Sequence, residues 1–190
     1  MRVLVLGTTG MLGYSLFANL SEYSHLEVFG TVRAVKGKEH YFPSLANIVT
    51  DVDVTDIDAL ETVLEDLAPD IVLNCIGLIK QHEVSKQHIS TIEINALLPH
   101  KLAELCERHD SRLIHFSTDC VFDGQGRLYS EEDTPNAIDL YGKSKCLGEV
   151  NYGCHLTLRT SIIGHELTSS VSLVDWFLNQ DEAQGYSKAV

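Results

Sequence analysis

Positive charge is scarce in this sequence of 190 residues. Its 14 Lys and Arg face 27 Asp and Glu, so the net charge is −13, and no basic run offsets this excess. Because such a chain repels phosphate backbones and anionic lipid surfaces, we expect neither nucleic acid nor a membrane as a partner. An anionic ligand therefore needs a local pocket that overrides the unfavourable overall field.

Long apolar runs and paired cysteines are also missing. The apolar run near the start, VLVL at 3–6, is too short for a signal-peptide core or for a membrane span, which needs about 20 residues. The five cysteines are scattered and none is spaced as CxxC, which argues against a disulfide framework and a cysteine zinc site. Both absences favour a reducing, cytoplasmic setting.

A histidine metal motif is absent too. The segment HEVSKQH places His88 six residues after His82, whereas a zinc-binding HExxH helix has its two histidines four residues apart on one face. We therefore predict no metal site.

What the sequence does contain is an alternation of apolar strands and amphipathic helices. Strands that are apolar throughout indicate a parallel sheet covered on both faces, so we predict an α/β fold with a doubly wound Rossmann sheet. The expected strands are residues 2–7, 26–32, 47–52, 70–77, 112–118 and 155–163. The expected helices are residues 11–20, 55–67, 89–108, 141–151 and 172–180, with Thr55 as the N-cap of the second and Pro99 kinking or starting the third.

A glycine-rich turn joins the first strand to the first helix. GTTGMLG places Gly7, Gly10 and Gly13 where a backbone must turn sharply and approach a pyrophosphate closely. Free amides at the start of the following helix then meet the phosphates. The spacing GxxGxxG departs from the usual GxGxxG fingerprint, yet its position after the amino-terminal strand predicts a dinucleotide site. The residues expected to bind cofactor in this loop are Gly7, Thr9, Gly10, Met11 and Leu12.

The end of the second strand indicates which nicotinamide cofactor is bound. NAD-binding folds usually place an acidic residue there, whereas this strand runs into Thr31 and Arg33. A guanidinium suits a 2′-phosphate, so we expect NADP(H) to be preferred, with NAD(H) as the alternative. Further cofactor contacts are expected where the third and fourth strands end, at Asp53, Val54, Cys75, Ile76 and Gly77.

Two hydroxyl groups and a lysine indicate acid–base chemistry. Tyr141 and Lys145 in YGKSK are four residues apart, so they share one helix face, and an ammonium near a phenol favours the phenolate. The strand at 112–118 ends in Ser117 and Thr118, at the carboxyl edge where such sheets bind ligands. We expect Thr118 and Tyr141 to converge on one carbonyl oxygen, with Ser117 on the nicotinamide side.

Six segments occur in an order that resembles the extended short-chain dehydrogenases/reductases, with the dTDP-4-dehydrorhamnose reductase branch the most similar. The resemblance covers residues 1–165, and STDCVFDG together with YGKSK is its most specific part. Cys120 stands where that branch usually has Tyr. The six segments are GTTGMLG, DIVLNCIG, INALLPHKLAE, STDCVFDG, YGKSKCLGE and LRTSIIG.

This resemblance implies an NADPH-dependent reductase that acts on the 4-keto group of a nucleotide-activated sugar. In the family, the threonine matching Thr118 binds the keto oxygen and the tyrosine matching Tyr141 donates the proton. Lys145 matches the lysine that binds the nicotinamide ribose and acidifies the tyrosine, and Asn95 matches an asparagine that braces the active site. These four residues are therefore expected at the site as catalytic or cofactor-binding groups.

The resemblance also implies a domain order and leaves alternatives open. Residues 1–160 correspond to the NAD(P)-binding domain, and residues 161–190 to the beginning of a substrate-binding region that is longer in the family. Residues 78–80 depart from the family's small-residue run, so the sugar is left undetermined. The alternatives are a nucleotide-sugar epimerase or dehydratase, and a non-catalytic NADP-binding regulatory subunit like that of methionine adenosyltransferase. A homodimer and a monomer both stay open.

Overall fold

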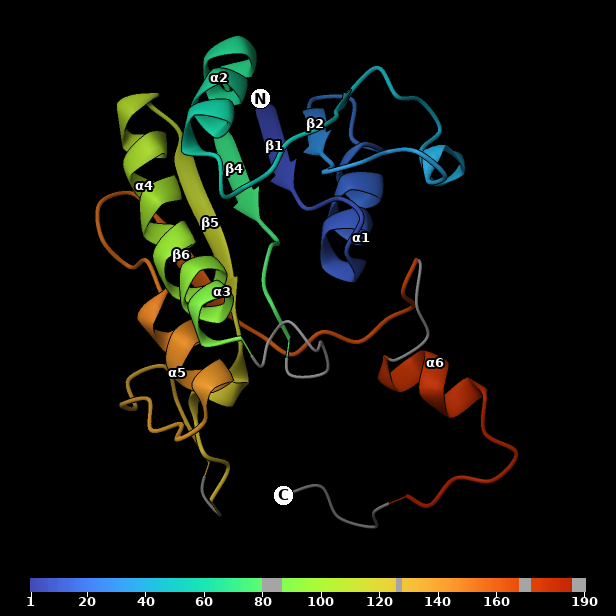
Figure 1. Ribbon diagram of the computed structural model, residues 1–190, viewed down its shortest axis with the longest axis vertical. Coiled ribbons are helices and arrows are strands. Elements are labelled where there is room, and N and C mark those ends of the chain that lie inside the picture. Colours follow the sequence, from blue (N-terminus) through green and yellow to red (C-terminus); the bar gives the residue numbers. More distant parts are fainter. Residues whose placement is uncertain (80–86, 126–127, 168–171, 186–190) are drawn as a thin grey trace.

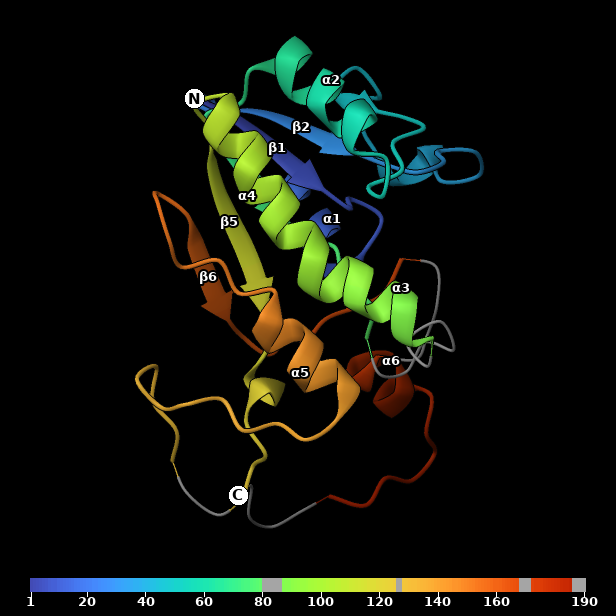
Figure 2. The same cartoon turned by 60° about the vertical axis from the view of Figure 1, so that its left-hand side comes forward.

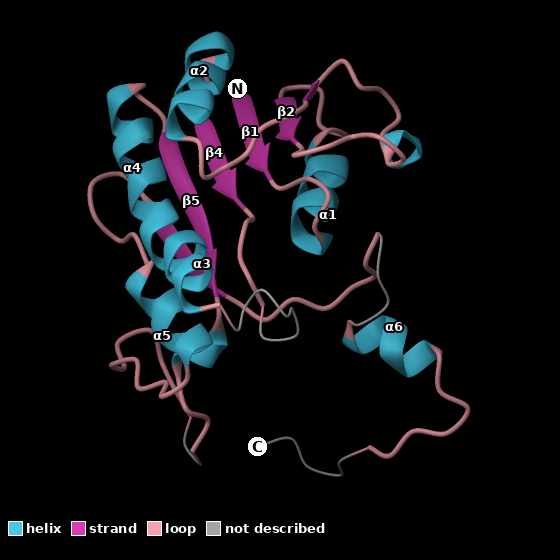
Figure 3. Ribbon diagram, viewed as in Figure 1, coloured by secondary structure: helices cyan, strands magenta, loops and turns pink. Residues whose placement is uncertain are grey.

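Six parallel strands form one sheet in this computed structural model, which describes residues 1–79, 87–125, 128–167 and 172–185. The strand order is β3-β2-β1-β4-β5-β6, so the doubly wound sheet predicted from the sequence is confirmed (Figure 3). The strands are β1 (Arg2–Leu6), β2 (Glu27–Thr31), β3 (Ile48–Val49), β4 (Ile71–Asn74), β5 (Arg112–Ser117) and β6 (Leu156–Arg159).

Helices cover both faces of this sheet. Helix α1 packs on one face, while α2 and α4 pack on the other (Figures 1 and 2). Within the described residues, none of the helices combines the length and apolarity that crossing a membrane requires. The helices are α1 (Met11–Leu20), α2 (Ile57–Leu67), α3 (His88–Ile92), α4 (Leu98–Arg108), α5 (Leu140–Leu147) and α6 (Leu173–Leu178), and the shorter turns are η1 (Glu39–Tyr41), η3 (Glu93–Leu97) and η4 (Asp119–Val121).

Alternate residues of the central strands pack into two separate hydrophobic cores, one on each face of the sheet. In β1, Val3 and Val5 join the core under α1, whereas Leu4 and Leu6 join the core under α2 and α4. Because each strand is buried on both faces, its sequence is apolar throughout instead of alternating. This is why the strand pattern alone indicated a parallel sheet.

The start of α2 differs from the prediction by one residue. Asp56, and not Thr55, is the N-cap, and its side chain accepts a hydrogen bond from the Ala59 backbone N–H at 3.1 Å. The hydroxyl and N–H of Thr55 instead donate to Asp53, at 2.8 and 2.9 Å. An aspartate two residues before Thr55 thus captures it in a turn, which leaves the capping position to the next carboxylate.

The long helix expected at 89–108 is continuous but contains a π-helical turn. This turn, η3, covers Glu93–Leu97 and lies between α3 and α4. Pro99 follows it in the first turn of α4 and has no N–H to donate to the Asn95 carbonyl one turn earlier. The widened turn absorbs this missing hydrogen bond, and π turns of this kind are frequent at functional sites.

The order in which the chain adds strands reverses at the centre of the sheet. Strand β1 has β2 on one side and β4 on the other, so the chain winds outward in opposite directions from β1. A crevice opens beyond the carboxyl ends of the strands at such a point, and ligands of doubly wound folds bind there. Helix α5 and the η4 turn lie at this carboxyl edge, and α6 lies beyond it (Figure 1).

Candidate functional site

The glycine loop forms the first wall of the crevice. Gly7 has φ +83°, and a Cβ there would meet the Ile76 side chain at 3.0 Å. A Cβ on Gly13 would lie 2.2 Å from the Gly7 carbonyl oxygen, so α1 packs on the loop only because residue 13 is glycine. Gly10 caps α1, a helix of ten residues whose free N–H groups face an incoming anion. The loop therefore offers bare backbone to a pyrophosphate.

The ends of β2 and β3 carry the next residues that the sequence predicts to bind cofactor. The buried Thr8 hydroxyl donates to the Thr31 carbonyl at 2.8 Å, which ties the glycine loop to the end of β2. Arg33 is exposed just beyond this strand. Hydrogen bonds from Thr55 lower the pKa of Asp53, and the Arg33 guanidinium contributes to the same effect. Arg33 and Asp53 thus lie near enough to interact electrostatically, and their contacts with a cofactor stay a prediction.

The chain leaves β4 in a turn that passes close to the buried Lys145 amine. The Oδ1 atom of the Asn74 side chain accepts from the Ile76 N–H at 3.1 Å and turns the chain out of the strand. Burial raises the pKa of the Cys75 thiol to about 12, so this thiol stays protonated. A Cβ on Gly77 would lie 3.8 Å from the Lys145 amine, so the loop after β4 passes close to this buried group.

Asn95 fixes the segment that follows β4. Its side chain accepts from the Leu78 N–H at 2.8 Å and donates to the Leu78 carbonyl at 2.9 Å. It also lies 3.4 Å from the Ser144 hydroxyl on α5. The π turn that carries Asn95 thus joins the β4 loop to α5, which is the bracing position expected for this residue.

Lys145 is buried at the centre of the site. It is 4% exposed, and its amine donates to the Phe116 carbonyl at 2.6 Å. Burial lowers the pKa of this amine to about 8, although the carboxylate of Glu149 acts in the opposite direction. Tyr141 lies one turn earlier on the same face of α5, in a helix that Asp139 caps. The pair predicted from YGKSK therefore has an amine whose pKa lies well below that of an ordinary lysine.

Thr118 and Tyr141 are brought to the same edge by a close backbone contact. The Thr118 hydroxyl accepts from the Cys120 N–H at 3.1 Å, which starts the η4 turn. A Cβ on Gly142 would lie 2.3 Å from the Cys120 carbonyl oxygen, so η4 can approach α5 only at a glycine. The Thr118 hydroxyl also bonds Asp119 at 3.2 Å. A carbonyl substrate would take this donor over from the carboxylate.

Ser117 faces α5 and is held by an ion pair. Its hydroxyl donates to Glu149 at 2.9 Å, and Arg159 binds the same carboxylate through two nitrogens, each at 2.8 Å. This bidentate pair joins the end of α5 to the end of β6. The hydroxyl therefore braces the site in this structure, and its contact with the nicotinamide stays a prediction.

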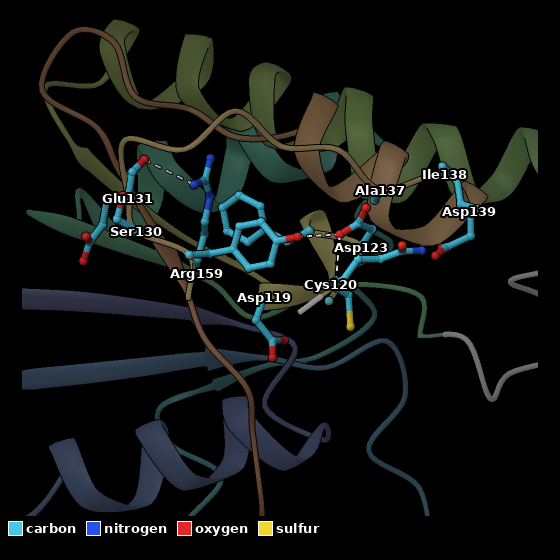
Figure 4. A pocket seen from close by; sticks show the side chains of 13 residues that line it. Asp119, Cys120, Asp123, Ser130, Glu131, Ala137, Ile138, Asp139 and Arg159 are labelled. Atoms are coloured by element: carbon cyan, nitrogen blue, oxygen red, sulfur yellow. Dashed lines mark hydrogen bonds between the residues drawn. The ribbon is translucent and has the colours of Figure 1, made fainter. Parts of the chain in front are cut away.

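A cavity of about 630 Å³ adjoins the Thr118 end of the site (Figure 4). It lies beyond β5 and β6, between the η4 turn and the residues that precede α5. The Phe122 and Tyr129 rings stack on its wall with centroids 4.4 Å apart, and Arg159 lies over Phe122 at 5.2 Å. Cys120, which replaces the usual tyrosine of the branch, also lines this cavity.

Sequence reasoning missed two buried members of the site. His115 lies beside Lys145, and Glu149 holds both Ser117 and Arg159. A usable signal existed for the first, since a histidine inside a strand buried on both faces needs a polar partner. Among the site positions discussed from sequence, Lys80 and His82 lie outside the described residues.

One group of possible metal ligands occurs among the described residues, away from this crevice. It consists of Glu61, Glu65 and His109, whose ligand atoms lie within 4.8 Å of one another. These residues are on α2 and just after α4, towards the amino edge of the sheet. Arg108 already pairs with Glu61 at 2.5 Å. The group therefore plays no part in the crevice.

Comparisons with known proteins agree with this geometry. A family model described as the RmlD substrate binding domain matches residues 1–174. The probable low-salt glycan biosynthesis reductase Agl14 of Haloferax volcanii is 32% identical over 151 residues, which cover 78% of this chain and 48% of that protein. Methionine adenosyltransferase 2 subunit beta of Rattus norvegicus is 28% identical over 148 residues, which cover 78% of this chain and 41% of that protein.

A solved structure with a bound cofactor is also similar. The crystal structure of dTDP-4-dehydrorhamnose reductase from Bacillus anthracis in complex with NADP has a TM-score of 0.66 and 26% identity, and the match covers 87% of this chain and 56% of that one. The present chain spans about half the length of the curated relatives it matches. Sequence, fold and site geometry together place it in the RmlD substrate-binding domain family of the extended short-chain dehydrogenases/reductases.

Proposed function

We propose that this protein is an NADPH-dependent reductase of the 4-keto group of a nucleotide-activated sugar. The observation that carries the proposal is the buried amine of Lys145, 4% exposed and with a pKa lowered to about 8, one helical turn from Tyr141. Burying an amine is costly, and a protein that only binds nucleotide has no use for one beside a phenol.

The residues of the crevice suit a bound dinucleotide. Gly7, Gly10 and Gly77 leave backbone bare along it, and a side chain at Gly7 would press on Ile76 and strain the turn at its φ of +83°. When bound, the dihydronicotinamide would supply the hydride for the reduction. Arg33, exposed at the end of β2, supports a preference for the 2′-phosphate of NADP(H).

The protein's own part in the reaction is to bind and protonate the carbonyl oxygen. Thr118 and Tyr141 act as two hydroxyl donors to that oxygen, and Tyr141 passes its proton to the developing alkoxide. The Lys145 ammonium stabilises the phenolate that remains and can restore the phenol by giving up its own proton, which leaves a neutral amine. Asn95 holds the backbone of the β4 loop in place through both of its hydrogen bonds to Leu78.

The nucleotide sugar would lie against the cavity beside Thr118. Residues 1–160 would then form the cofactor-binding domain, and residues 161–190 would begin the substrate-binding region. Stacked rings and carboxylates on the cavity wall suit a polyhydroxylated sugar.

The direct test is NADPH oxidation by the full-length protein with a panel of dTDP- and UDP-linked 4-keto sugars. The expected result is turnover of at least one sugar, with NADPH preferred over NADH. NADPH binding without turnover of any of these sugars would contradict the proposal and favour a non-catalytic, NADP-binding regulatory role. An epimerase or dehydratase would instead convert sugars without net NADPH consumption.

A further inference from the structure

His115 has no role in the reaction as described so far, yet it lies within the site. Its side chain is completely buried in β5, between Asn74 on β4 and Lys145 on α5. The Asn74 amide nitrogen lies 3.0 Å from the Nδ1 atom of the ring, and the Lys145 amine lies 3.3 Å from the Nε2 atom. The three side chains therefore form one buried hydrogen-bonded chain.

The direction of the hydrogen bonds in this chain can be assigned from its ends. The Asn74 oxygen already accepts from the Ile76 N–H, so its NH₂ group faces His115 and donates to Nδ1. A neutral ring that accepts at Nδ1 carries its hydrogen on Nε2, which faces Lys145. An N–H can donate to an unprotonated amine but not to an ammonium.

The surroundings keep this ring neutral. Burial lowers the pKa of His115 to about 3, and the charges of Lys145 and then His100 act in the same direction. The groups that face the Lys145 amine are His115 and the Phe116 carbonyl from β5, with Glu149 one turn on along α5. The carboxylate of Glu149 favours the ammonium but is shared with Arg159 and Ser117, and the Phe116 carbonyl accepts a hydrogen bond from either form of the amine.

We propose that His115 is a positioning residue of the proposed reductase, which through the chain Asn74–His115–Lys145 fixes the lysine amine one helical turn from Tyr141 and eases its loss of a proton. The neutral amine completes every bond of the chain, since it accepts from His115 and donates to the Phe116 carbonyl. The ammonium form faces an N–H and loses that bond. The catalytic importance of this chain rests on the proposed function. Its effect on the protonation of Lys145 does not.

The first measurement needs no substitution. ¹⁵N NMR of the histidine-labelled full-length protein, free and with NADP⁺, reports which ring nitrogen of His115 carries the hydrogen. Hydrogen on Nε2 is the expected result. Hydrogen on Nδ1 would overturn the proposal, because the ring would then accept from an ammonium and favour it.

The second measurement is the titration of the Lys145 amine by NMR of lysine-labelled protein, with its signal assigned from Lys145→Arg. In His115→Leu the amine loses the ring N–H, and the pKa of Lys145 should rise by about one unit, the equivalent of one hydrogen bond. His115→Gln presents an amide N–H in the same direction and should keep the titration of the parent protein. An unchanged Lys145 titration in His115→Leu would refute the inference.

His155 provides the matched control. It is a second buried histidine against β5, and its Nδ1 accepts from the Leu113 N–H at 3.1 Å. His155→Leu should leave the Lys145 titration unchanged, and an equal shift in both variants would mean a general loosening of the fold. In the active enzyme the pH profile of kcat should move with the NMR titration. If no sugar is reduced, the function fails while the two NMR measurements still decide the role of His115.

Discussion

Arg33 is the residue whose charge distinguishes the two nicotinamide cofactors. Arg33→Ala should weaken NADPH binding by about ten- to a hundredfold, because one or two charge-assisted hydrogen bonds to the 2′-phosphate are lost. NADH lacks that phosphate, so its affinity should stay the same. Titration of both cofactors by fluorescence measures this. Arg2→Ala, at the opposite edge of the sheet, is the control, and equal losses for the two cofactors would contradict the NADP(H) preference.

Tyr141 is the residue to which the proposed function assigns the proton. Tyr141→Phe keeps the ring and removes only the hydroxyl, so kcat for sugar reduction should fall by about 10²- to 10⁴-fold. The dissociation constant of NADPH should change little, since the glycine loop and Arg33 are unaltered. Steady-state assays and cofactor titration of the same preparation separate the two effects. A variant with parental kcat would mean that another group donates the proton.

At the scale of elements, the crossing of α5 and the π turn depends on Gly148. A Cβ at this position would lie 2.0 Å from the Asn95 carbonyl oxygen, which is backbone and has little freedom to move. Gly148→Ala should therefore lower the free energy of unfolding by about 1–3 kcal/mol or more. Urea unfolding measures this loss. Gly185→Ala, where a Cβ meets nothing within 4 Å, should be neutral, and equal stability of the two variants would contradict the packing argument.

The same elements separate what the sequence predicts from what it does not. The order and type of the main strands and helices follow from apolar periodicity, and the glycine loop follows from its position after β1. The π turn does not follow from periodicity. Pro99 cannot donate to the Asn95 carbonyl, and that carbonyl packs against Gly148, which is distant in sequence. The start of α2 was misplaced because two aspartates compete for Thr55 and the first helical amides. Competition between neighbouring polar side chains for one helix start does not alter the apolar periodicity, so the periodicity cannot predict its outcome.

For the whole molecule, His115 makes stability depend on pH. Its pKa lies at about 3 in the folded protein and at the ordinary 6.5 when unfolded, so the unfolded chain binds more protons between these values. The neutral ring therefore contributes stability that is fully present above about pH 6.5 and is lost as the pH falls towards 3. Lys145 acts similarly at higher pH, since its pKa rises from about 8 to 10.5 on unfolding.

Urea unfolding between pH 4 and 7 checks this dependence, because most of this range lies between the folded and unfolded pKa values of His115. Stability should fall by a few kcal/mol towards the acid end, and His115→Leu should show a shallower slope than the parent protein. His155→Leu should keep the parental slope if His115 is the group responsible. Parallel slopes for His115→Leu and the parent would assign the acid sensitivity to other groups.

The site as a whole was only partly visible in the sequence. Residues that follow strands, such as Gly7, Asn74 and Thr118, could be placed at one edge because parallel strands end together. His115 and Glu149 could not be placed, because each acts through a partner that depends on how α5 crosses β5. Topology thus predicts which residues meet at an edge, whereas the packing of one helix decides which buried groups support them.

The side chain of Asn95 pairs with both backbone groups of Leu78 in the manner of a neighbouring strand. The path of the chain at residue 78 is therefore set by the π turn that carries Asn95, and not by the identity of residue 78 itself. Because both bonds go to backbone atoms, the side chain at residue 78 can change without loss of either bond, and the loop after β4 keeps its course.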